Sequence, residues 1–519
     1  MAVQQLRPRS RRSKWTRLGA GVLGALVLSS SLVACGGASS SSSENDTLRF
    51  ASYGPPIRTW DPHRDGRAAS NLMLFAVYDR LIGVDPNGAL IPQLATAWEF
   101  SDATTLDLTL REGVTFQDGT AFDGEAVKAN IERAQTIDDG TGPWAAPLSV
   151  VKAVEVTSPT SVSLKLKAPS AALPNLLADA AGAMISPAAF TKDLNQVTAG
   201  AGMYSLAKWT ADGSATFEAY DGYWDADSVG PSTIEMPFQL DQLRRLDMLK
   251  AGEVDATFGH TSFVDAAERD GRKVAPAVGV NFWMLDFNRA SKPFDDKRVR
   301  LAINYALDAQ PMIDALLAGQ AEKNQQPFNE SSVGFSEEVG KTPYERDVKR
   351  SRELLAEAGH QNGISFDCAV VAGSGGAYSA YLEVIKEQLA EAGIKLDIKL
   401  VESQSAALLI DKSVDCALLP YGTGSPIVLA KQLFATDGYY NAGKVADEET
   451  TALLAALDEP QSDDELGADF DALVKKVIDD ALFTGVFFEQ WAVVSDERVK
   501  GLDFYTTGQY TEFRGVSVD

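Results

Sequence analysis

The sequence predicts an α/β protein built from two unlike parts. In the second part, apolar strand patterns alternate with amphipathic helix patterns, and the loops between them are short. Strands and helices that alternate in this way form right-handed parallel units in an open sheet. In the first part, short alternating apolar runs follow one another with turn residues between them, which indicates a β-rich region with few helices.

The N-terminus has the features of an export signal. Residues 1–34 contain six basic residues and no acid, and an apolar run occupies 18–28. This run is too short to span a bilayer as a stable helix. The pair Arg11 and Arg12 faintly resembles a twin-arginine signal, but Lys14 stands where an apolar residue is usual. We therefore expect export by the general secretory route.

Cys35 follows this segment in the sequence LVAC, which resembles the lipobox of bacterial lipoproteins. The resemblance implies cleavage before Cys35 and a diacylglyceryl thioether on its sulfur. The glycines and serines of 36–43 then form a flexible, solvated tether. We expect a body held by a lipid anchor at the extracytoplasmic face of the cell membrane. The alternative is an ordinary signal peptide that happens to contain a cysteine.

The composition limits what this body can bind. The chain has 519 residues, 45% of them hydrophobic, which suits a globular core and two or more domains. Its formal net charge is −25, which argues against nucleic acid and against anionic membrane surfaces as partners. Acidic excess also keeps an exported protein soluble, and this is the simpler explanation of the charge.

Two cysteines, Cys368 and Cys416, remain once Cys35 is lipidated. Disulfides form in oxidising compartments outside the cytosol. A disulfide between the two is therefore possible, although the sequence favours two buried free thiols on neighbouring strands.

Local patterns place the elements of the first part. Residues 47–53 read as a strand, and the alternating runs at 98–100 and 106–110 read as a hairpin. Asp123 is a candidate N-cap, since the helical stripe that follows it is apolar. Two further strands are expected over 149–167.

The second part contains the alternating units. The predicted elements are helices at 299–306, 311–319 and 380–393, and strands at 364–371, 394–400 and 414–422. Gly393 ends the third helix. Ligands in such sheets bind beyond the carboxyl ends of the strands, which here are followed by the loops AGSGGAY and GTGSP.

Several blocks together resemble family 5 of the bacterial extracellular solute-binding proteins. The first, at 95–133, reads ATAWEFSDATTLDLTLREGVTFQDGTAFDGEAVKANIER. A block at 199–226, then LKAGEVDATF, FNRASKPFDDKRVRLAINYALDAQPMIDALLAG and RELLAEAG, follow in the family's order. The resemblance covers nearly the whole chain after the signal peptide.

This resemblance implies a two-lobed periplasmic-binding-protein-like α/β fold of type II. Two crossing segments join the lobes, and an extra β-rich domain is inserted in the first lobe. The implied segments are 1–34 as lipoprotein signal peptide, 35–46 as lipidated cysteine and tether, 47–85 with 200–280 and 490–519 as lobe 1, 86–199 as inserted domain, and 281–489 as lobe 2. A ligand is expected between lobes that close on it.

The implied function is solute capture for an ABC importer, with its permease and its ATPase as partners. The expected solute is peptide-like or another polar organic molecule, and the protein is expected to be monomeric. Nickel or another metal chelate, or an oligosaccharide, is an alternative ligand in the same fold. A ligand-sensing receptor without a transport role is an alternative of a different class.

An enzyme is not favoured by any motif in the chain. The three histidines are scattered without a partner spacing, and no C-x-x-C, H-E-x-x-H or Walker P-loop occurs. We expect no catalytic residue, no cofactor and no resident metal.

The family resemblance also supplies the candidate ligand contacts. They are Tyr53 at the end of the first strand and Gly54 after it, His260 after EVDATFG, Met284 and Asp286 on the strand 280–288, Tyr421 near the end of the strand 414–422, and Ser425 after it. Asp286 could hold a cationic group, or it could be a charge paired inside the hinge. A lone histidine is more often an ordinary surface or packing residue, and this is the alternative for His260.

Departures from the family pattern bear on the ligand. Family members that take free dipeptides hold the ammonium with an aspartate and the carboxylate with an arginine. In this chain Ser425 stands where the acid is expected, and 372–377 contains no arginine. A buried peptide terminus without a countercharge is costly, so a small zwitterionic peptide is not favoured.

Overall fold

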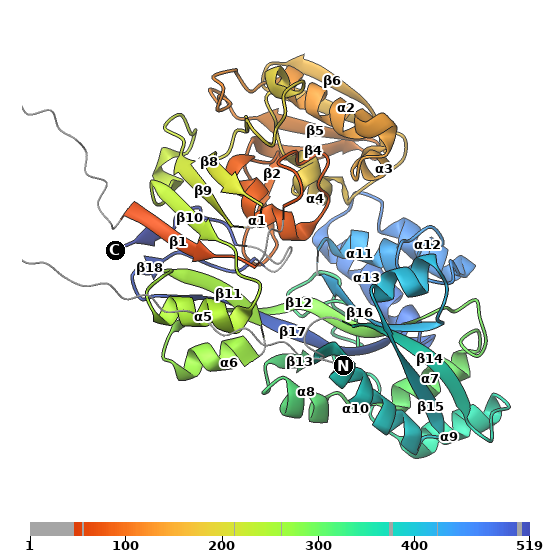
Figure 1. Cartoon of the computed structure of the whole chain (residues 1–519). Coiled ribbons are helices and arrows are strands. Elements are labelled where there is room, and N and C mark those ends of the chain that lie inside the picture. The colour runs from red at the N-terminus through yellow and green to blue at the C-terminus, as the bar shows by residue number, and fades with distance from the viewer. Residues whose placement is uncertain are drawn as a thin grey trace, which may run out of the picture. The chain divides into compact units, whose positions relative to one another are not determined.

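An 11-stranded sheet runs through most of the structure (Figure 1). The computed structural model describes residues 46–519 except 54–56, 212, 261, 373–376, 423 and 506–510. The strand order is β15 (Ile394–Val401), β14 (Ile364–Val371), β16 (Cys416–Gly422), β12 (Lys273–Phe287), β17 (Thr484–Ser495), β11 (Ala256–His260), β1 (Thr47–Ala51), β10 (Thr233–Pro237), β9 (Ser214–Ala219) and β8 (Tyr204–Thr210). The short strand β13 (Ala321–Lys323) pairs with β17 beside this path.

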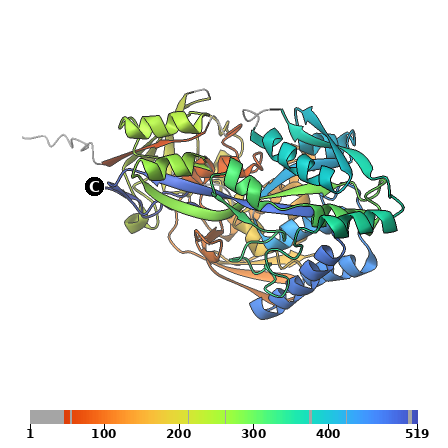
Figure 2. The ribbon, with the colours of Figure 1, turned by 90° about the horizontal axis from the view of Figure 1, so that it is seen from below.

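Two long strands, β12 and β17, connect the two ends of this sheet (Figure 2). They pair antiparallel with each other. The C-terminal half of β12 also pairs with β16, and the C-terminal half of β17 pairs with β11. We call the part from β11 to β8, with the elements packed on it, the first lobe, and the part from β16 to β15 the second lobe. The two crossing segments are therefore β12 and β17.

The second lobe has helices on both faces of its strands. Alternation along β12 places Trp283 and Leu285 in one core and Phe282 and Met284 in the other. The first core is covered by α7 (Lys297–Ala306), α8 (Gln310–Leu316), α9 (Val348–Glu357) and α10 (Ala377–Glu391), and the second by α11 (Pro426–Phe434), α12 (Glu448–Ala456) and α13 (Asp463–Asp479). The parallel pair β14 and β15, with α10 between them in the chain, confirms the expected strand–helix–strand unit.

Cys368 and Cys416 are joined by a disulfide. They are register partners on the parallel strands β14 and β16, with Cα atoms 4.4 Å apart. This separation lies within the range of roughly 4.4–6.8 Å that disulfides require. The expectation of two free thiols is therefore wrong, because the pairing of β14 with β16 sets the two cysteines directly opposite each other.

A four-stranded antiparallel sheet occupies the first part of the chain. Its order is β4 (Ala95–Asp102), β5 (Thr105–Leu110), β7 (Ser161–Leu166) and β6 (Val151–Ser158). The predicted hairpin and the predicted pair of later strands are both confirmed. α2 (Gly124–Gly140) packs beside this sheet, and Asp123 accepts a hydrogen bond of 3.0 Å from the Ala126 N–H at its start. The predicted N-cap is confirmed, and the apolar stripe behind it is buried.

The remaining elements complete the first lobe. Its larger core includes α1 (Ala68–Val77), α4 (Leu173–Leu177) and the hairpin of β2 (Ile82–Val84) and β3 (Leu90–Pro92). A smaller core lies under α5 (Gln242–Lys250) and α6 (Ser262–Arg269). The short elements α3 (Ala145–Leu148), β18 (Val499–Lys500) and β19 (Ser517–Val518) lie outside the main sheet. Among the described residues, no helix is long and apolar enough to cross a membrane.

Candidate functional site

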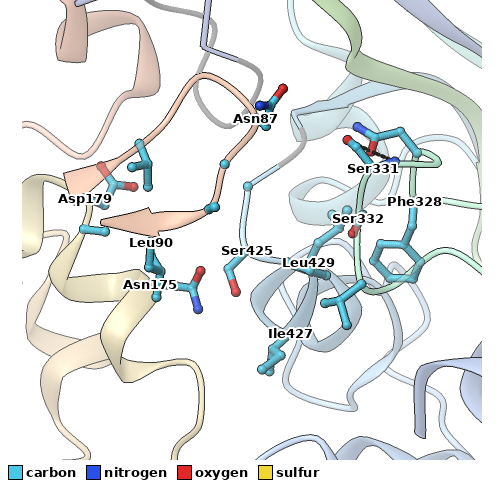
Figure 3. Close-up of a pocket in the computed structure, with 18 of the residues that line it drawn as sticks. Asn87, Leu90, Asn175, Asp179, Phe328, Ser331, Ser332, Ser425, Ile427 and Leu429 are labelled. Carbon is cyan, nitrogen blue, oxygen red and sulfur yellow. Dashed lines mark hydrogen bonds between the residues drawn. The ribbon is translucent and has the colours of Figure 1, made fainter. Parts of the chain in front are cut away.

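A cavity of about 700 Å³ is lined by residues of both lobes (Figure 3). Small-molecule sites in proteins have volumes of roughly 300–1,000 Å³. The first lobe supplies one wall from α1, the β2–β3 hairpin, β4 and the end of α4. The second lobe supplies the other wall from the segment 327–333, the start of α11 and the start of α13. The cavity is therefore the candidate ligand site.

The carboxyl group of Asp179 is the main polar feature of the first wall. Its Oδ1 accepts a hydrogen bond of 2.7 Å from the Ala180 N–H and one of 3.2 Å from the Asn71 amide. The first bond caps the 3-10 turn at 180–182 and the second comes from α1, so two elements hold the carboxyl group. Burial raises the pKa of Asp179 above its usual range, because desolvation disfavours the charged form.

The second wall places a hydroxyl group at the start of α11. Ser425 is the N-cap residue of this helix, but its side chain makes no capping hydrogen bond. Its Oγ is buried and has no hydrogen-bond partner among the described residues. Across the cavity, the amide of Asn175 on α4 points toward the same space (Figure 3). The two walls thus present uncharged hydrogen-bonding groups to each other.

Three aromatic rings of described residues contribute to the apolar lining. Phe75 comes from α1, Trp98 from β4, and Phe328 from the segment 327–333. Phe328 is held in place by the Phe470 ring of α13, with the ring centroids 5.2 Å apart. Rings combined with amide and hydroxyl groups suit a polar organic solute that also has apolar surface.

Of the residues predicted from sequence, Ser425 lines this cavity. Tyr53 follows β1, with its ring 5.2 Å from that of Phe258, and burial raises its pKa to about 12. His260 ends β11, where its Nδ1 lies 2.7 Å from the Glu489 carboxylate. Neither Tyr53 nor His260 belongs to the cavity lining, and their contact with a ligand stays a prediction.

Met284, Asp286 and Tyr421 lie in the core of the second lobe. Their exposed fractions are 1%, 5% and 2%. Asp286 accepts hydrogen bonds from the Tyr421 O–H at 3.2 Å and from the Phe287 N–H at 2.8 Å. Burial raises the pKa of Asp286 to about 7, although the nearby Arg289 lowers it. None of the three lines the cavity, so their role as ligand contacts also stays a prediction.

Two predicted residues, Gly54 and Cys35, lie outside the described residues. Sequence reasoning missed Asn71, Asn175 and Asp179, which the fold brings to the first wall. No motif marks them, since they belong to a helix, a five-residue helix and a turn that meet only in the folded chain.

Comparison with known proteins settles the family. The model of "Bacterial extracellular solute-binding proteins, family 5 Middle" matches residues 89–440, which is more than half of the chain. This chain belongs to that family. The glutathione-binding protein GsiB of Salmonella paratyphi A is 30% identical to this family 5 protein over 364 residues, covering 69% of this chain and 70% of the relative.

Solved structures of other solute-binding proteins are similar to this chain. DppA of Helicobacter pylori, solved in complex with the peptide STSA, matches with a TM-score of 0.74 at 22% identity, over 91% of this chain and 98% of that chain. NikA of Staphylococcus aureus, solved with Ni(L-His)2, matches with a TM-score of 0.74 at 19% identity, over 91% of this chain and 100% of that one. The expected two-lobed α/β fold class is confirmed.

Family membership settles the function at a coarse level. The protein is an extracytoplasmic solute-binding protein of the ABC-importer class, and it is not an enzyme. Proteins of this family work with an ABC permease and its ATPase and bind small molecules or peptides. Within the described ranges, no three His, Cys, Asp or Glu side chains come together as a metal ion would require.

Proposed function

We propose that this protein is a lipid-anchored receptor that captures a small polar organic or peptide-like solute between its lobes and delivers it to an ABC permease. The observation that carries the proposal is the cavity of about 700 Å³, whose walls come from different lobes. A solute that contacts both walls stabilises the arrangement in which the lobes lie together. The protein's conformation then reports occupancy to the permease.

The anchor in this proposal is a thioether-linked lipid on Cys35, supported by the LVAC sequence and the serine-rich tether after it. A tethered receptor stays close to the permease that it serves, and a flexible linker keeps its effective concentration there high. The proposed domains keep the bounds expected from sequence. They are the signal peptide at 1–34, the lipidated cysteine and tether at 35–46, the inserted domain at 86–199, lobe 2 at 281–489, and lobe 1 in its three pieces.

The ligands of similar proteins set the range to be tested. Glutathione is named for the Salmonella relatives, a peptide for the Helicobacter structure, and a nickel–histidine complex for the Staphylococcus structure. A free dipeptide is the least suited of the peptide ligands, since Ser425 replaces the acid that would hold its ammonium. An oligosaccharide or a metal chelate is the second candidate, and a sensing receptor without transport is the third.

Native mass spectrometry of the full-length chain, purified without denaturation, tests the proposal, because solutes held between closed lobes survive gentle purification. We expect a small-molecule mass that is released on unfolding. Asn175→Trp should fill the cavity and abolish this mass, whereas Val197→Trp, at a surface position that is 50% exposed, should retain it. A bound solute that survives Asn175→Trp unchanged would place the site elsewhere and contradict the proposal.

A further inference from the structure

The ionisable side chains among the described residues that line the inter-lobe cavity are all acidic. Its charged residues are Asp179 and Asp463, and the described lining contains no lysine, arginine or histidine. The undescribed positions within 46–519 are Gly, Pro, Asp, Thr, Ser, Gln and Tyr, so none of them adds a basic side chain. Every basic residue of the folded body is therefore described, and none belongs to the lining.

Arg80 is a basic residue that contacts this wall, and its charge is used inside the protein. It is 1% exposed, and its Nη2 lies 2.5 Å from the Glu512 carboxylate. Its Nη1 donates to the Ala178 carbonyl at 3.2 Å, and the guanidinium lies 4.0 Å from the centre of the Phe75 ring. Phe75 and Ala178 line the cavity and Arg80 does not. The guanidinium is therefore unsuited to hold a carboxylate in the cavity.

Asp179 has an oxygen to offer a ligand. Both of its hydrogen bonds, from Ala180 and Asn71, go to Oδ1. Its Oδ2 has no hydrogen bond to another described residue, and the residue is partly exposed where it lines the cavity. Burial raises its pKa, and Arg80 and the two hydrogen bonds act in the opposite direction. A cationic group within about 4–6 Å would relieve the cost of this desolvated carboxylate.

The remaining polar groups of the cavity are neutral. The Ser425 Oγ has no partner among the described residues, and Asn175 makes no side-chain hydrogen bond to another described residue. Figure 3 shows Asn175 and Ser425 on opposite walls, with Asp179 on the same side as Asn175. An amide and a hydroxyl group bind neutral donors and acceptors of a ligand, and neither supplies a countercharge for an anion.

We propose that this cavity selects a small cationic solute whose protonated nitrogen pairs with Asp179 and whose neutral polar groups hydrogen-bond to Asn175 and Ser425, and that it discriminates against solutes with a carboxylate. The inference rests on the proposed function, since it names the charge class of the solute for the same cavity. It also separates this chain from its glutathione-binding relatives, because glutathione has two carboxylates that this lining leaves without a cation.

A set of closely related ligands that differ in charge at their two ends tests the proposal. Alanyl-alanine amide is a cation, its N-acetyl derivative is neutral, N-acetyl-alanyl-alanine is an anion, and alanyl-alanine is a zwitterion. Isothermal titration of each against the full-length chain should rank the cation first. A charge-assisted hydrogen bond makes the cation bind about tenfold to a hundredfold tighter than the anion. Glutathione should bind in the weak range of the anion.

Asp179→Asn is the decisive variant. Asparagine is a good N-cap, so it preserves the turn that Asp179 begins and the chain should fold. We expect the affinity for the cation to fall by about tenfold or more, while the neutral ligand changes by less than about threefold. Asp241→Asn is the matched control, since Asp241 is an exposed N-cap residue at the start of α5 in the first lobe and does not line the cavity. Its effect on the cation should stay below about threefold.

Three results would overturn the proposal: an anion that binds as tightly as the cation, the absence of any charge preference, or an Asp179→Asn protein that binds the cation unchanged. Its failure is distinct from failure of the proposed function. An anionic solute that co-purifies and is lost in Asn175→Trp would leave the receptor function standing and refute only the charge class.

Discussion

The disulfide between Cys368 and Cys416 should stabilise the second lobe measurably. The two cysteines are 48 residues apart in sequence, and the enclosed loop contains α10 and β15. Closing a loop of this length in the unfolded chain removes conformational entropy worth about 4 kcal/mol. Removing the bond by the double substitution Cys368→Ala and Cys416→Ala should lower the free energy of unfolding by roughly that amount.

Thermal unfolding followed by circular dichroism converts this free energy into a temperature. If residues 46–519 unfold together, their entropy of unfolding is about 1 kcal/mol/K, and the Tm falls by about 4 °C. If the second lobe unfolds by itself, fewer residues share the loss, and its transition falls by roughly twice as much. The size of the shift therefore also reports whether the lobes unfold as one unit.

Reduction provides the control. Dithiothreitol should lower the Tm of the wild type toward that of the double variant and should leave the variant unchanged. Both sulfurs are fully buried, so the difference between reduced wild type and variant isolates the loss of sulfur packing. Thiol titration of denatured, non-reduced protein decides the case: two free thiols from 368 and 416 would refute the disulfide and the stability argument with it.

Three further predictions concern the anchor, the closure and the buried acid. Cys35→Ser should release the protein from membranes or leave an unprocessed precursor, and a processed, lipid-labelled Cys35→Ser form in the membrane fraction would disprove the anchor. Small-angle scattering should give a smaller radius of gyration with a bound solute than without one; a solute that binds without compaction would exclude capture between closing lobes. Asp286→Asn should gain stability relative to wild type as the pH rises from about 4 to about 7. The wild-type carboxyl group has a pKa of about 7 when folded and near 3.8 when unfolded, so the folded state holds its proton more tightly through this window and loses stability as the proton leaves. Urea unfolding of both proteins at several pH values measures this, and parallel curves would show that the burial of Asp286 has no such cost.

Most local elements were predictable because their signals act over a few residues. Asp123 caps α2 through a contact three residues away, and Gly393 ends the α10 region with a positive φ of 83°. The strand–helix–strand unit of β14, α10 and β15 follows from apolar periodicity and short loops. Such patterns depend on residues that are close in sequence, so tertiary contacts change the resulting elements little.

The candidate site was predictable only at Ser425. The family resemblance located the loop after β16, which does reach the cavity. The other wall includes α1 and the turn after α4, whose Asn71 and Asp179 are 108 residues apart and are joined by a hydrogen bond. The sequence also predicted that alternate residues of β12 share one face. That face packs against α11 and α13 in the core and does not line the cavity.

The sequence by itself therefore determined the α/β fold class, the family and most element boundaries, because periodicity, caps and motif order are local properties of the chain. The tertiary structure alone decided that Cys368 and Cys416 are register partners, that the charge of Arg80 is paired with Glu512, and that the cavity has acidic side chains without a basic one. These features depend on contacts between residues that are distant in sequence. Pairing register and side-chain direction set such contacts, and no local pattern encodes them.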